Sequence, residues 1–264
     1  MISYNDFGLL YTSRGEGMSN KATISKKDER ILHTKSGNRC AMCKMILVET
    51  NNSSAVCIGE NAHIYGEKPD AARYDANKDE GFVNSEANLI FLCCNCHKKI
   101  DTDISSYPPE DLFSLKEQHE QWVIQKLEEE SVSFSFAELE VLANYLVSST
   151  TPAQSITSFS LVKIENKINK NDLQTVQKYI TMGLSNSFTI EDYLNRHPDP
   201  SFAAKLTTIM AQKYQELKSR DLDSQGIFSE LWDFASGKHN DFSYKAAGLG
   251  ILTYFFEKCE VFEK

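Results

Sequence analysis

The chain has 264 residues, of which 41% are hydrophobic and 25% charged, and its formal net charge is −9. This composition is ordinary for a globular protein, and the length allows one or two domains. The longest apolar stretch, around residues 249–256, is far too short to cross a bilayer, and the N-terminus lacks the pattern of a secretion signal. We therefore expect a cytoplasmic protein with no contact with the membrane.

The negative charge is unevenly distributed along the chain. Residues 19–101 carry 12 Lys/Arg against 11 Asp/Glu, whereas residues 102–264 carry 15 against 24. Affinity for nucleic acid without sequence preference grows with the number of phosphates that basic side chains neutralise. The nearly neutral first part predicts weak intrinsic binding to DNA, unless a partner delivers the substrate.

The first half of the chain alternates helical and strand-like signals. Residues 1–17 show no periodicity, and residues 1–23 are interpreted as an N-terminal extension. A charged helix is expected over residues 24–36, because Gly37 is a favoured helix terminator. Apolar runs at residues 54–58 and 88–92 predict two strands, with a polar segment between them.

The second half shows helical signals throughout. Pro108 and Pro109 open a long helix, since a missing N–H costs nothing at the first helical position. A further helix is expected over residues 136–147, followed by a linker at 148–152. The run at 249–256 is apolar almost all round, which predicts the buried centre of a helical bundle.

Four of the seven cysteines form two closely spaced pairs. The pairs are Cys40 with Cys43 and Cys93 with Cys96. Two such turns place four thiolates around one point, which predicts a structural Zn²⁺ site with no open position for water. Cys94 could replace Cys93 as the fourth ligand. Cys57 and Cys259 are expected to be core cysteines.

Residues between and after the cysteine pairs resemble the HNH (ββα-metal) endonucleases. Ala62-His63-Ile64 matches the first His, Asn88-Leu89-Ile90 the Asn, and Cys96-His97 the last His. Zinc-containing members frame the motif with the same two cysteine pairs, and the resemblance covers about residues 24–125. It implies a nuclease that hydrolyses DNA phosphodiester bonds.

The resemblance also implies a role for each matched residue. His63 would be the general base that activates water, and the Asn88 amide would tie down the loop after the first strand and so orient His63. His97 would coordinate one divalent cation, Mg²⁺ or Mn²⁺. Asp101 follows His97 by one helical turn and is the expected second ligand.

Two positions leave alternatives open. Many family members carry an Asp or His metal ligand immediately before the base, where this chain has Ala62. Glu60, Asp101 or water could supply the missing ligand. Arg73 is either a bidentate clamp for the scissile phosphate or an ordinary surface arginine.

The last residues, 246–264, look like the end of a helical C-terminal domain of effectors from bacterial ABC-three-component defence systems. That resemblance implies that residues 131–264 dock the nuclease on an SMC-like ABC ATPase and a middle component. The alternative is a helical bundle that makes a homo-oligomer, since symmetric dimers are common.

Together these observations predict an α+β protein with an extension at 1–23, a small zinc-stapled ββα-metal nuclease domain at 24–130 and an all-α domain at 131–264. Two other functions remain open. One is a non-catalytic zinc-stapled module that binds nucleic acid or a protein partner. The other is an HNH effector of a cyclic-nucleotide-sensing defence system, whose ligand-sensing domain would be larger and contain strands.

Overall fold

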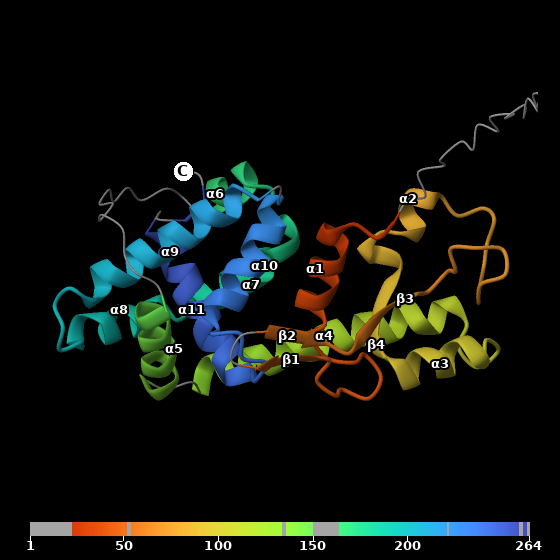
Figure 1. Cartoon of the computed structure of the whole chain (residues 1–264), viewed down its shortest axis with the longest axis horizontal. Helices are drawn as coiled ribbons and strands as arrows, with labels where there is room; N and C mark the ends of the chain where they lie inside the picture. The colour runs from red at the N-terminus through yellow and green to blue at the C-terminus, as the bar shows by residue number, and fades with distance from the viewer. Residues whose placement is uncertain are drawn as a thin grey trace, which may run out of the picture.

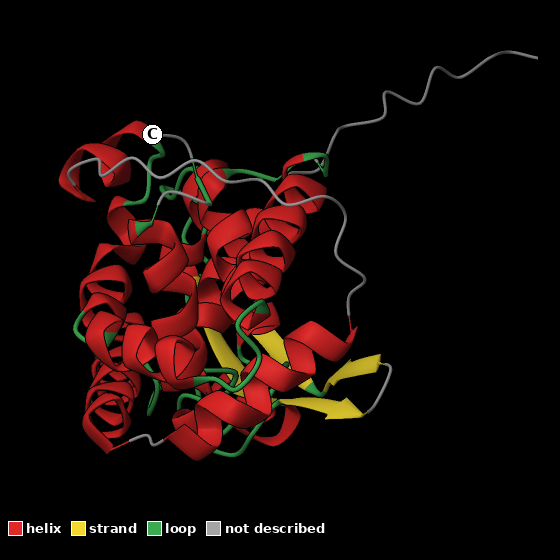
Figure 2. Cartoon of the chain, turned by 90° about the vertical axis from the view of Figure 1, so that its left-hand side faces the viewer, coloured by secondary structure: helices red, strands yellow, loops and turns green. Residues whose placement is uncertain are grey.

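The computed structural model describes residues 23–51, 54–133, 136–149, 164–220, 222–258 and 261–262. Within these residues helices dominate, and the strands form two separate antiparallel pairs (Figures 1 and 2). The elements, with η for 3₁₀ helices, are α1 Lys26–Lys35, β1 Val48–Asn51, β2 Ser54–Cys57, β3 Gly59–His63, α2 Glu80–Val83, η1 Glu86–Asn88, β4 Leu89–Cys93, α3 Cys94–Thr102, α4 Pro109–Ser133, α5 Phe136–Ser149, α6 Ile164–Lys170, η2 Gln174–Val176, α7 Gln177–Leu184, α8 Ser187–Arg196, α9 Phe202–Lys218, α10 Ser224–Ala235 and α11 Phe242–Glu257.

Helix α1 has local signals at both ends. Ser25 is its N-cap and accepts a hydrogen bond from the backbone N–H of Asp28. Gly37 follows the helix with a φ of 59°, a left-handed conformation that glycine adopts without strain. Ile31 and Leu32 are buried on one face of the helix. The helix expected over residues 24–36 is therefore confirmed.

The sequence predicted one strand at 54–58, ahead of His63, but the structure has two: β2 ends at Cys57, and a separate strand, β3, ends at His63. That run splits after Cys57: β2 pairs with β1, whereas β3 pairs with β4 so that His63 lies opposite Leu89. Gly59 pairs with Cys93 of β4, and a Cβ atom at this position would meet the Phe91 ring at 2.4 Å. A glycine at this position permits the close approach.

A small core holds the N-terminal unit together. Strand β4 is buried along its whole length, and α3 follows it directly. Leu32 of α1 and Leu112 of α4 pack on this strand with the cysteine turns. The result is two antiparallel strands followed by a helix, with α1 and α4 beside them (Figure 1).

Helix α4 belongs to both parts of the molecule. Its Leu112 lies in the N-terminal core, whereas Val123 and Leu127 lie in the larger helical core. The expected domain boundary between residues 130 and 131 therefore falls inside a continuous helix. Shared packing along α4 joins the two units (Figure 1).

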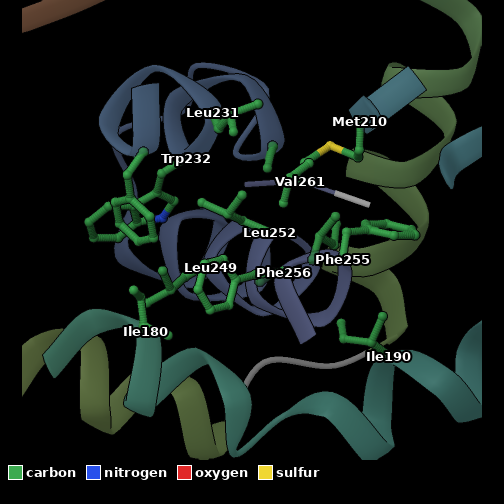
Figure 3. Close-up of a cluster of buried hydrophobic side chains, with 14 of the residues drawn as sticks. Ile180, Ile190, Met210, Leu231, Trp232, Leu249, Leu252, Phe255, Phe256 and Val261 are labelled. Carbon is green, nitrogen blue, oxygen red and sulfur yellow. The ribbon is translucent and has the colours of Figure 1, made fainter. Parts of the chain in front are cut away.

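The helical unit is built around α11, which is buried almost all round (Figure 3). Phe255 and Phe256 are fully covered, and each such side chain stabilises the fold by about 1.5–3 kcal/mol. At Gly248 a Cβ atom would meet the backbone of Ser236 at 2.6 Å, so this glycine lets α10 and α11 approach closely. The buried helix expected at 249–256 is confirmed. Among the residues described, no helix combines the length and apolarity that a membrane span requires.

Candidate metal centre and histidine cleft

The four paired cysteines converge on one point. The Sγ atoms of Cys40, Cys43, Cys93 and Cys96 all lie within 4.8 Å of one another. The Cys43 and Cys93 sulfurs are 3.8 Å apart, and a tetrahedral Zn²⁺ with Zn–S bonds of about 2.3 Å needs sulfurs roughly 3.8 Å apart. Cys94 is exposed and outside the cluster, so Cys93 is the fourth thiol. The set can hold a tetrahedral metal ion such as zinc.

Backbone hydrogen bonds fix both cysteine turns to β4. The N–H of Ala41 donates to the carbonyl of Phe91 at 2.9 Å, which attaches the first turn to the strand. Cys93 is the N-cap of α3, and its sulfur accepts from the N–H of Cys96 at 3.4 Å. Burial opposes ionisation of Cys40, but backbone hydrogen bonds outweigh it and lower the pKa of this thiol. These N–H groups favour the thiolate form that binds metal.

Lys44 and His119 lie beside the cysteine cluster. The Lys44 ammonium donates to the carbonyl of Ala41 at 2.7 Å and to His119 Nδ1 at 2.8 Å. The other ring nitrogen of His119 donates to the Ser36 carbonyl at 3.0 Å. Burial and the neighbouring Lys44 lower the pKa of His119 to about 4. The neutral ring is a packing residue that links α4 to the metal-binding turn.

The two remaining motif histidines meet at one cleft. His63 stands at the end of β3 and His97 in the first turns of α3. Both line a cleft of about 200 Å³ together with Gly66, Glu67, Lys68, Ala71, Ala72 and Asp101. The pairing of β3 with β4, and the direct passage of β4 into α3, bring these side chains together. The lining thus combines two imidazoles and one ammonium group with two carboxylates.

His63 has a buried amide partner. Its Nε2 atom lies 3.1 Å from Oδ1 of Asn84, which follows α2. Because an amide oxygen only accepts, this contact places the ring proton on Nε2 and leaves Nδ1 as the basic nitrogen. Asn84 was not singled out from the sequence.

The Asn88 amide ties together the segments on either side of the cleft. Its Oδ1 accepts from the Tyr65 N–H at 3.0 Å, and its Nδ2 donates to the carbonyls of Tyr65 at 3.0 Å and Val83 at 2.9 Å. The side chain is fully buried. Asn88 thus holds the loop that follows His63. The role expected for Asn88, to orient His63, depends on this contact.

The His97 ring lies between two carboxylates. Glu60 Oε2 is 2.6 Å from Nδ1, and Asp101 Oδ2 is 3.2 Å from Nε2. Asp101 lines the cleft with His97, whereas Glu60 does not. Over the described ranges, only the four cysteines form a group of three or more potential ligands close around one point. Within the cleft, His97 Nε2 and Asp101 contact each other, and Glu67 and His63 are the other lining side chains that could bind a cation.

Arg73 differs from both of its expected roles. Its side chain is 1% exposed. The guanidinium donates to the carbonyls of Ile64 at 2.8 Å, Ile100 at 2.7 Å and His63 at 3.4 Å, and to Asp101 Oδ1 at 2.6 Å. It is neither a surface arginine nor a side chain directed at a phosphate. With these contacts it connects the end of β3 to α3 and holds Asp101.

Cys57 also departs from its expected position. Its side chain is exposed and not part of a core, because it lies in the short β1–β2 hairpin. Cys259, the N-terminal extension and most of the expected linker lie outside the described residues.

Comparison with known proteins finds a family match in the helical half. Residues 137–263 match the family model of CTD10, the C-terminal domain 10 of the ABC-three component (ABC-3C) systems. This match confirms the resemblance expected for the C-terminal half. No curated protein matches the chain.

Proposed function

We propose that the chain is a metal-dependent endonuclease of the HNH type that hydrolyses DNA phosphodiester bonds. One observation carries the proposal: His63 and His97 line the same cleft. His63 ends strand β3, and His97 lies in helix α3, which directly follows β4, the partner strand of β3. The four convergent cysteines belong to the same unit. A strand-borne base facing a helix-borne metal ligand is the arrangement that the ββα-metal resemblance implies.

The residues around the cleft suggest a division of labour. His63, held through Nε2 by Asn84, would take a proton from the attacking water at Nδ1. The water oxygen would form a bond to phosphorus while the bond to the leaving sugar oxygen breaks. A Mg²⁺ or Mn²⁺ ion held by His97 and Asp101 would stabilise the charge on the phosphate and on the leaving oxygen. Arg73 would hold Asp101 in place for that ion.

The helical half gives this nuclease a context. A C-terminal domain of ABC-three component systems supports a role as the effector of a bacterial antiphage defence complex. Residues 131–264 would then dock on an SMC-like ABC ATPase and a middle component in the cytoplasm. The acidic helical half would repel DNA and keep the nuclease idle until the complex forms. The match favours this context over a cyclic-nucleotide-sensing system.

A second candidate function is a zinc-stapled binding module without catalysis. Ala62 motivates it, because this residue stands where many nucleases of the family carry a metal ligand. Ala62 is part of β3, and its side chain is fully buried in the N-terminal core, so it packs there and offers no ligand atom.

Conversion of supercoiled plasmid to nicked or linear DNA tests the two candidates. The zinc-loaded protein is incubated with Mg²⁺, with Mn²⁺ or without added cation. The nuclease proposal predicts cation-dependent cleavage that His97→Ala reduces strongly. Plasmid binding without cleavage, in the presence of the partner components and ATP, would instead support the binding module.

A further inference from the structure

Helix α1 lies between the helical unit and the strand that carries His63 (Figure 1). One face of α1 contacts α10 and Asp223, the residue that precedes α10. The contacts are Lys27 Nζ to Asp223 at 2.9 Å, Arg30 Nε to Glu230 at 2.9 Å and Thr34 Oγ1 to Ser229 Oγ at 2.9 Å. Residues three and four apart share one helix face, so these contacts form a single seam.

Two other side chains of α1 hold Asn61 in β3. His33 Nε2 donates to Asn61 Oδ1 at 2.8 Å, and Asn61 Nδ2 donates to Glu29 Oε1 at 3.2 Å. His33 also lies against the Phe91 ring, with centroids 4.1 Å apart. Burial lowers the pKa of His33, so the ring is neutral near pH 7 and donates a single proton here. The amide of Asn61 is thus held at both its oxygen and its nitrogen.

Asn61 is two residues before His63, and alternate residues of a strand point to the same side. Both side chains line a second cleft of about 370 Å³ with Glu29, Glu67 and Asn84. The hydrogen bonds from α1 to Asn61 therefore act on the same face of β3 as the His63 side chain.

A second attachment connects α1 to the segment that holds His63. Asp28 Oδ1 accepts from the Glu86 N–H at 2.8 Å, and Lys35 Nζ lies 3.1 Å from Glu86 Oε2. Glu86 stands between Asn84, which contacts His63, and Asn88, which holds the following loop. A displacement of α1 would therefore reach the segment that carries Asn84, the partner of the His63 ring, and Asn88, which holds the loop after His63.

We propose that α1 couples the helical unit to the cleavage site, with Asn61 as a positioning residue for His63. The contacts between α1 and α10 determine the position of α1. The hydrogen bonds from α1 to Asn61 in turn determine the position of His63. A cavity of about 220 Å³ lies at this seam, bordered by Arg30, His33, Thr34, Ser229 and Glu230 among others. Side chains of both helices border this volume, so the seam is not completely packed. The expected effect on the cleavage rate rests on the proposed nuclease function.

Reversal of one charge in the seam tests the coupling. Glu230→Arg places a cation opposite Arg30, and the double variant Arg30→Glu, Glu230→Arg restores the attraction with the signs exchanged. Glu216→Arg is the matched control, because it makes the same charge change on α9, where Glu216 pairs with Lys213 and Arg220 and not with a residue of α1. Thr34→Val is a second, milder variant that removes the bond to Ser229 without a change of shape.

Two readouts are taken on the full-length, zinc-loaded chain. The first is the NMR signal of the His63 ring in protein labelled at histidine. The second is the rate of plasmid cleavage, for which we expect a loss of about tenfold, because a misplacement of 1 Å at a reacting group costs up to about a hundredfold. Glu230→Arg and Thr34→Val should shift the His63 signal, the double variant should return it, and Glu216→Arg should leave it unchanged.

An unmoved His63 signal in Glu230→Arg and Thr34→Val, with zinc content and melting temperature retained, would overturn the coupling. So would a double variant that stays as impaired as Glu230→Arg. The ring signal does not depend on activity. If the wild type and His63→Ala cleave DNA equally, the nuclease proposal fails, but the signal still decides whether α1 positions His63.

Discussion

Glu60 Oε2 lies 2.6 Å from His97 Nδ1, across the ring from the nitrogen that faces Asp101. Both ring nitrogens face a carboxylate, and the shorter contact, at Glu60, favours the ring proton on Nδ1, which leaves Nε2 and Asp101 as the pair that would share a cation. Glu60 comes from β3 and His97 from α3, so the contact also fixes the ring relative to the strand that carries His63. We infer that Glu60 orients His97, the proposed ligand of the divalent cation, and is not itself a ligand.

This role predicts a graded loss of cation affinity. Glu60→Ala should weaken Mn²⁺ binding to the zinc-loaded protein about 10- to 100-fold, the usual effect of a lost outer-shell partner. Glu60→Gln should have a smaller effect, because its amide oxygen can still accept from Nδ1. Electron paramagnetic resonance measures free Mn²⁺ in the titration. A loss as complete as that of His97→Ala would make Glu60 a direct ligand and contradict the account.

The four-cysteine cluster predicts a sharp contrast between neighbouring thiols. Cys43→Ser should lose bound zinc and unfold the N-terminal unit, since structural zinc contributes about 10–16 kcal/mol of binding free energy in small domains. Cys94→Ser is the matched control, because its side chain is exposed and outside the cluster. Elemental analysis of purified protein gives the zinc content. Zinc loss in Cys94→Ser but not in Cys43→Ser would refute the assignment of ligands.

Arg73 should matter for stability as well as for the cleft. Arg73→Met removes hydrogen bonds to the carbonyls of Ile64 and Ile100 and leaves these oxygens without that donor. We expect the free energy of unfolding to fall by about 3 kcal/mol. Urea denaturation measures it. Arg196→Met removes an exposed ion pair with Asp192 and should change stability by less than about 1 kcal/mol. Equal effects of the two substitutions would contradict the buried role of Arg73.

His119 predicts a dependence of stability on pH. Its pKa is about 4 in the folded protein, against about 6.5 for an unperturbed histidine. The unfolded chain therefore binds a proton at a higher pH than the folded chain does. The free energy of unfolding should fall as pH drops from about 6.5 to 4, by roughly 3 kcal/mol, and should not change from this cause above that window.

The variant His119→Gln isolates the contribution of this histidine. Denaturation curves of wild type and variant at several pH values give the difference in stability, which cancels the pH dependence of the other groups. The difference should shrink as the pH falls through the window. A constant difference would show that His119 titrates normally in the folded protein.

Local signals made parts of the fold predictable. Gly37 marks the end of α1, and the apolar run at 249–256 marks a buried helix, because the cause of each lies within a few residues. Likewise the paired spacing of the cysteines brings four thiols together, since a CxxC turn positions both of its sulfurs. These features need no knowledge of distant contacts.

The features that were missed depend on contacts between distant segments. The separation of β2 from β3 reflects the different strands with which they pair, and β4, the partner of β3, lies in a distant part of the chain. Arg73 lies in a polar segment of the sequence. Nothing near it in the chain indicates that its side chain is buried and donates to four acceptors. The grip of α1 on Asn61 joins side chains 28 and 32 residues apart.

Cleavage of an end-labelled DNA duplex by His63→Ala, compared with His239→Ala, tests the central claim most directly. His239 is an exposed histidine of the helical unit, stacked on Tyr244 and away from the cleft. Both variants should retain zinc and the melting temperature of the wild type. With Mn²⁺ and the partner components present, we expect His63→Ala to lose at least about a hundredfold in rate, and His239→Ala to cleave like the wild type. Equal cleavage by His63→Ala and the wild type would show that His63 is not the base.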